Sequence, residues 1–116
     1  MRNDKGNIIV EKSFQFALKV VIYCDLLEDN KRYVISRQLL RSGTSIGANV
    51  REAQNAESKA DFIHKIKLAA KEAEETEYWL LICKQSPGYP FDPQLISDIQ
   101  ELIKILSKII SSSKNN

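Results

Sequence analysis

The sequence predicts an all-α protein folded as an antiparallel up-down-up-down four-helix bundle, and three observations lead to this fold class. Apolar residues recur at helical spacing in four separate segments. The breaks between the segments are polar or contain proline and are only a few residues long, which makes consecutive helices antiparallel neighbours. No segment reads as a strand. We therefore expect one domain over residues 1–116, with helices at about residues 8–27, 36–57, 59–86 and 93–112.

Composition limits the class of protein. The chain has 116 residues, of which 43% are hydrophobic and 28% charged, as in an ordinary soluble domain. No apolar run has transmembrane length and the first residues do not resemble a signal peptide, so we expect a cytoplasmic protein without a membrane partner. The net charge of +2 is too small to indicate nucleic acid by itself. Cys24 and Cys83 lie on apolar stripes, so we expect them to be reduced core residues.

The first predicted helix, residues 8–27, carries two apolar stripes where a bundle needs one. We expect one stripe to face the core; it consists of Phe14, Ala17, Leu18, Val21 and Cys24. We expect the other to contact another subunit, because large exposed apolar patches rarely remain free; it consists of Phe16, Val20, Tyr23 and Leu27. The alternative is that residues such as Tyr23 widen the core. Residues 1–7 are polar and should be frayed.

The second predicted helix, residues 36–57, contains two glycines. Ser36 is the expected N-cap, with Ile35 and Leu40 placed to form a hydrophobic staple. Gly43 and Gly47 each weaken a helix by about 1 kcal/mol relative to alanine, so a neighbouring backbone should pack closely there. The core stripe is Ile35, Leu39, Ile46, Val50 and Ala53.

The third predicted helix, residues 59–86, also has a second line of residues beside its core stripe. Ser58 is the expected N-cap, with Asp61 as its capping-box partner. The expected core stripe is Phe62, Ile66, Ala69, Ala73, Thr76, Leu80 and Cys83. The second line is the other candidate subunit interface and consists of Leu68, Glu72, Glu75, Trp79 and Ile82.

The fourth predicted helix, residues 93–112, has a single apolar face. Asp92 is the expected N-cap and Pro93 the first helical residue. The apolar face consists of Leu95, Ile99, Leu102, Leu106 and Ile109. The polar tail from Ser111 to Asn116 should be disordered.

No catalytic or metal-binding constellation is recognisable, so we expect neither an enzyme nor a cofactor. The glutamates of residues 72–77 could suggest a di-iron bundle, but that class needs a Glu-x-x-His motif on two helices and His64 is the one histidine. The two glycines are not followed by the Gly-Lys-Ser/Thr of a phosphate-binding loop. The glutamates are better explained as a solvated face that pairs with lysines or neighbouring chains.

Three arginines of the second helix are candidates for nucleic-acid binding. Arg37, Arg41 and Arg51 lie on the face opposite the core stripe, separated by small residues. Repeated around an oligomer, they would form a positive surface for backbone phosphates of RNA or DNA. The alternative is that Arg41 pairs with a carboxylate such as Glu52 or Glu75, within the chain or in a neighbouring copy.

One string of residues resembles a known family. The string is Gln38, Arg41-Ser42, Ser45-Ile46, Asn49 and Glu52, followed by the Ser58 to Phe62 joint, Ala69-Ala70-Lys71-Glu72-Ala73, Glu75-Thr76-Glu77 and Trp79-Leu80. It looks like the four helix bundle proteins encoded in 23S rRNA intervening sequences. Many relatives carry Pro and Gly where this chain has Gly47 and Ala53.

The resemblance implies a bacterial bundle that assembles as a ring-shaped homopentamer and has no established activity. The family is similar in fold to the accessory protein of diversity-generating retroelements, which binds nucleic acid and a reverse transcriptase. Two functions are therefore expected as alternatives. One is a nucleic-acid-binding or ribonucleoprotein accessory module, and the other is a structural oligomer whose partner is another protein.

Overall fold

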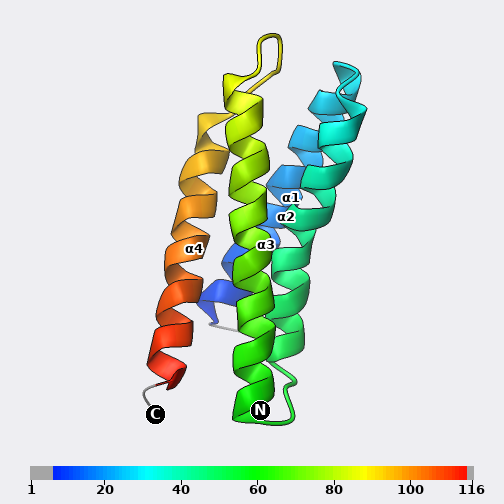
Figure 1. Cartoon of the computed structure of the whole chain (residues 1–116). Helices are drawn as coiled ribbons and strands as arrows, with labels where there is room; N and C mark the ends of the chain where they lie inside the picture. Colours follow the sequence, from blue (N-terminus) through cyan, green and yellow to red (C-terminus); the bar gives the residue numbers. More distant parts are fainter. Residues whose placement is uncertain (1–6, 115–116) are drawn as a thin grey trace.

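The computed structural model describes residues 7–114, and four helices take up 85% of them. The helices are α1 (Ile8–Asp29), α2 (Tyr33–Ala53), α3 (Lys59–Gln85) and α4 (Pro93–Lys114). They form an elongated bundle of 47 × 22 × 21 Å (Figure 1). The predicted all-α four-helix fold is confirmed. No helix of the described chain is long and apolar enough to cross a membrane.

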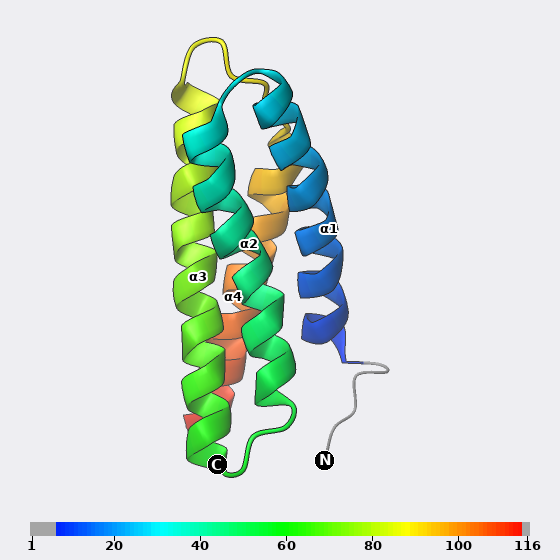
Figure 2. The same ribbon diagram turned by 90° about the vertical axis from the view of Figure 1, so that its right-hand side faces the viewer.

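Neighbouring helices run in opposite directions around the bundle (Figure 2). At the α1–α2 contact, Ser13 lies beside Gly47 and Val20 beside Gly43, so residue numbers rise in one helix as they fall in the other. The α1–α4 seam is bridged by ion pairs, with Lys19 Nζ 2.8 Å from Asp98 Oδ2. α1 and α3 do not pack against each other and form the diagonal pair. The chain therefore passes up, down, up and down through the four helices.

The core uses the other stripe of α1 from the one predicted. Phe16, Val20, Tyr23 and Leu27, predicted as a subunit interface, are at most 4% exposed and lie in the protomer's own core. Of the predicted core stripe, Cys24 is buried and Ala17 half-buried, whereas Phe14, Leu18 and Val21 are exposed.

Contacts from distant parts of the chain explain this orientation. Val20 fits against Gly43, where an added Cβ would lie 2.9 Å from the valine Cγ1. Tyr23 donates a hydrogen bond of 2.7 Å to the carbonyl of Pro90. Cys24 and Cys83 are buried free cysteines, as predicted, and burial raises the pKa of the Cys24 thiol to about 11.

The stripes of the other three helices face the core as predicted. In α2 and α3, Ile35 and Phe62 are partly buried, and in α4 Ile109 is partly buried. All other predicted members of these stripes are at most 2% exposed; they are Leu39, Ile46, Val50 and Ala53 of α2, Ile66, Ala69, Ala73, Thr76, Leu80 and Cys83 of α3, and Leu95, Ile99, Leu102 and Leu106 of α4.

Two predicted limits of α2 were wrong. The helix begins at Tyr33, so Ser36 lies inside it and is not the N-cap. The Ser36 hydroxyl is instead buried within hydrogen-bond distance of the Cys24 carbonyl, at 3.2 Å, and of the Glu28 carboxylate, at 3.1 Å. α2 also ends at Ala53 rather than at about residue 57.

The caps predicted for α3 and α4 are confirmed. Ser58 Oγ accepts from the Asp61 amide at 3.0 Å, and Asp61 accepts from the Glu57 amide at 3.2 Å. At α4, Asp92 accepts from the Gln94 amide at 3.0 Å. α4 continues to Lys114, so most of the tail predicted to be disordered is helical. Of the residues predicted to be frayed or disordered at the two ends, 1–6 and 115–116 lie outside the described chain.

Candidate interaction surfaces

The outward face of α1 carries a continuous line of exposed apolar side chains. They recur at helical spacing along the side opposite the core. Their exposed fractions run from 42% at Val21 to 70% at Ile22. We call them the outer stripe of α1; its members are Phe14, Leu18, Val21, Ile22 and Leu26. Such a line on a small soluble domain is typical of an interaction surface.

A shallow hollow extends the outer stripe towards α2. Its volume is about 240 Å³, and small residues of the two helices contribute to it. The guanidinium of Arg51 lies 5.5 Å from the ring centre of Phe14, close enough for a cation–π contact at its rim. The hollow is lined by Val10, Phe14, Ala17, Thr44, Gly47, Ala48 and Arg51.

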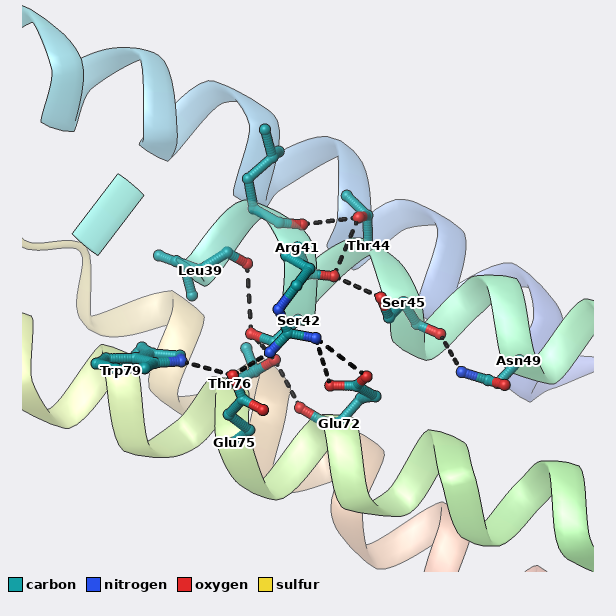
Figure 3. A network of polar contacts seen from close by, with 11 residues as sticks. Leu39, Arg41, Ser42, Thr44, Ser45, Asn49, Glu72, Glu75, Thr76 and Trp79 are labelled. Atoms are coloured by element: carbon teal, nitrogen blue, oxygen red, sulfur yellow. Dashed lines mark hydrogen bonds and ion pairs between the residues drawn. The ribbon is translucent and has the colours of Figure 1, made fainter. Parts of the chain in front are cut away.

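Arg41 joins α2 to two carboxylates of α3 (Figure 3). Its Nη1 lies 3.2 Å from Glu72 Oε2, and its Nη2 pairs with Glu75 Oε2. Glu75 also accepts a hydrogen bond of 2.9 Å from the indole nitrogen of Trp79. The Trp79 hydrogen bond and then the Arg41 pair hold the pKa of Glu75 below its ordinary value. The alternative predicted for Arg41, an ion pair with Glu75, is confirmed within the chain.

A buried polar contact lies between α2 and α3 close to this ion pair (Figure 3). The hydroxyls of Ser42 and Thr76 are 2.9 Å apart and share a hydrogen bond, and both residues are fully buried. Thr76 also lies 2.8 Å from the Glu72 carbonyl oxygen. Because a shift of either helix would leave a buried hydroxyl without its partner, this contact fixes the register of α3 against α2.

The second line of α3 is not an exposed apolar surface. Leu68, Trp79 and Ile82 are half-buried in the protomer itself. Glu72 and Glu75 of the same line bind Arg41 of α2. The large apolar side chains that α3 exposes are instead Tyr78, at 59%, and Leu81, at 41%. The sequence contains no apolar periodicity that would predict these two residues as a surface, because they interrupt a mostly charged face.

The three candidate arginines differ in their surroundings. Arg37 and Arg51 are exposed, and neither forms an ion pair with another residue of 7–114. Arg41 is also exposed, but its charge is compensated by two carboxylates. The predicted stripe of three free guanidinium groups is therefore reduced to Arg37 and Arg51.

Comparison with known proteins places the chain in a family. No curated protein matches it. A crystal structure of a protein of unknown function from the S23 ribosomal protein family of Bacteroides thetaiotaomicron is 42% identical, with a TM-score of 0.81 over 88% of this chain and 97% of that one. Residues 5–112 match the 23S rRNA-intervening sequence protein family. Since this match spans nearly the whole bundle, the chain belongs to the 23S rRNA-intervening sequence protein family.

Proposed function

We propose that this protein is a non-enzymatic, self-associating helical bundle whose outer stripe of α1 contacts a second copy. The observation that carries the proposal is the exposure of five large apolar side chains along one face of a helix that is otherwise packed in the core. Removing this surface from water is favourable by roughly 25 cal/mol per Å² of apolar area buried. The resemblance to the family implies a homopentamer, which has five times the protomer mass.

The proposal predicts that charged substitutions in the outer stripe separate the copies without unfolding them. Leu18→Glu combined with Ile22→Glu places two carboxylates in the contact, where their burial is costly. We expect light scattering to give an oligomer for the wild type and the protomer mass of 13.2 kDa for the variant, with the same helical circular dichroism. Ser107→Glu, at an exposed position of α4, is the control and should remain oligomeric. A monomeric wild type at micromolar concentration would refute self-association.

Nucleic-acid binding is the second candidate function. It is favoured by Arg37 and Arg51, which are exposed on the outer side of α2 without a carboxylate partner in the described chain. In an oligomer these cations recur once per subunit, so their effect exceeds what the net charge of +2 suggests. Contacts of this kind hold phosphates without reading the base sequence.

The second candidate predicts a strong salt dependence. Affinity for mixed RNA or DNA should fall steeply between about 50 and 200 mM salt, because phosphate contacts release counterions. Arg37→Ala with Arg51→Ala should make the slope shallower, measured by fluorescence anisotropy. The control Lys104→Ala with Lys108→Ala removes the same charge from α4 and should leave the slope nearly unchanged. Absence of binding at the lowest salt would leave self-association as the function.

A further inference from the structure

We propose that the outer stripe of α1 binds the exposed face of α3 around Tyr78 and Leu81 in a second copy. The contact is head to tail, and the two helices are parallel and at the same height along the bundle axis. This inference rests on the proposed self-association and goes beyond it by naming the second surface. It is carried by the apolar side chains that α3 exposes, by the heights of the two faces along the bundle, and by their charges.

The α3 face offers a preoriented aromatic anchor. Tyr78 is 59% exposed and its ring meets that of Trp79 edge-on, with centroids 5.4 Å apart. Trp79 is in turn held by its hydrogen bond to Glu75. A tyrosine restrained in this way loses little conformational freedom on binding, which suits it to the centre of an interface. Leu81 lies one turn further on the same helix.

The two faces lie at the same height on opposite sides of the bundle. Val20 of α1 contacts Gly43, and the adjacent Ser42 bonds to Thr76 of α3, so Val20 and Thr76 belong to one layer. α1 and α3 run in the same direction (Figures 1 and 2). Ile22 and Tyr78 each lie two residues beyond that layer, or about 3 Å along the axis. Two copies side by side therefore bring Ile22 against Tyr78 without sliding.

The charges favour this pairing over a two-fold contact of α1 with itself. The charged residues on the outward side of α1 are all acidic, namely Glu11, Asp25 and Asp29. Antiparallel packing of two such helices would bring like charges together. The outward side of α3 carries two cations below Tyr78, Lys67 and Lys71, and one carboxylate, Glu74. Counted from the same layer, Glu11 and Lys67 each lie nine residues below it, so they face each other in the parallel arrangement.

Each copy thus presents one surface of each kind, and the contact is heterologous. A heterologous contact closes into a ring when the rotation between copies divides the circle, and otherwise continues as a filament. Because the two surfaces are level, repeating the contact adds little translation along the bundle axis. The arrangement is therefore compatible with a closed ring.

Two variants that each lack one surface test the inference. Leu18→Glu with Ile22→Glu removes the α1 surface, and Tyr78→Glu with Leu81→Glu removes the α3 surface. We expect each variant alone to be monomeric and helical, and their equimolar mixture to form a 1:1 heterodimer and nothing larger. Light scattering gives the masses and circular dichroism shows that both variants are folded. Should the α3 variant lose its helicity, Tyr78→Ala with Leu81→Ala takes its place.

The outcomes separate this inference from the proposed function. An α3 variant that keeps the wild-type mass would overturn the α1–α3 contact and leave self-association through α1 intact. A monomeric wild type would overturn both. As a test of register, Glu11→Lys and Lys67→Glu should each weaken association by about two- to five-fold, and together should restore it. Two weakened single variants without recovery in the double variant would overturn the level arrangement.

Discussion

Replacing Phe16 by alanine is expected to lower the free energy of unfolding by about 3–5 kcal/mol, the usual cost of removing a buried aromatic side chain. Phe14→Ala, two residues earlier, is expected to cost no more than about 1 kcal/mol. Phe16 is 2% exposed in the core, whereas Phe14 is 46% exposed and contacts Arg51. Urea denaturation measures both values, and it should be carried out in the Leu18→Glu, Ile22→Glu background so that association does not contribute.

The comparison decides which stripe of α1 faces the core. The two substitutions remove the same atoms from the same helix, so their effects on helix propensity cancel. A larger loss for Phe14→Ala than for Phe16→Ala would mean that α1 is rotated and that the outer stripe belongs to the core. Equal losses would contradict the separation of α1 into a buried and an exposed face.

The stripes of α2 and α4 could be predicted because each of these helices has one side that is clearly richer in apolar residues. The stripe of α3 could be predicted because its members recur at alternating spacings of four and three residues from Phe62 to Cys83. α1 gives no such signal, since both of its sides are apolar. Its rotation depends instead on partners that are distant in the sequence. Gly43 accommodates Val20, and the Pro90 carbonyl accepts the hydrogen bond of Tyr23. Periodicity within α1 contains no information about either partner.

Helix caps show the same division between local and distant causes. The caps at Ser58 and Asp92 were predicted correctly because each bonds to a residue two or three positions away. Ser36 has the residue type of an N-cap, but its hydroxyl bonds to α1, at Glu28 and Cys24, eight and twelve positions away. The Ser36 hydroxyl thus makes a tertiary contact in place of the predicted capping bond, and α2 begins before Ser36, at Tyr33.

The candidate surfaces could be predicted only in part. The ion pair of Arg41 could be predicted only as an alternative, with Glu52 or Glu75 as its partner in the same or a neighbouring chain; in the structure Arg41 pairs with Glu72 and Glu75 of its own chain. The exposed apolar residues did not follow, because deciding which residues are exposed on α1 required its rotation. On α3, the two residues Tyr78 and Leu81 are too few to form a periodic pattern in a charged segment, and their exposure emerges only from the packed structure.

Two glycines of α2, four residues apart, are expected to respond to substitution in opposite directions. A side chain at Gly43 would place its Cβ 2.9 Å from Cγ1 and 3.0 Å from Cγ2 of Val20, which is fully buried. Valine has one strongly preferred rotamer in a helix and cannot turn away. Gly43→Val should therefore lower the free energy of unfolding by about 2–3 kcal/mol through overpacking.

At Gly47, by contrast, an added Cβ meets Ser13 Oγ at 3.4 Å, an ordinary contact. Gly47→Ala should raise the free energy of unfolding by up to about 1 kcal/mol, because alanine restores helix propensity without a clash. Urea denaturation of both variants in the same monomeric background measures the difference. A loss of stability for Gly47→Ala would show that the added Cβ meets Ser13 at less than the 3.4 Å given by the structure. A neutral Gly43→Val would show that Val20 can move, and that close packing at Gly43 does not set the rotation of α1.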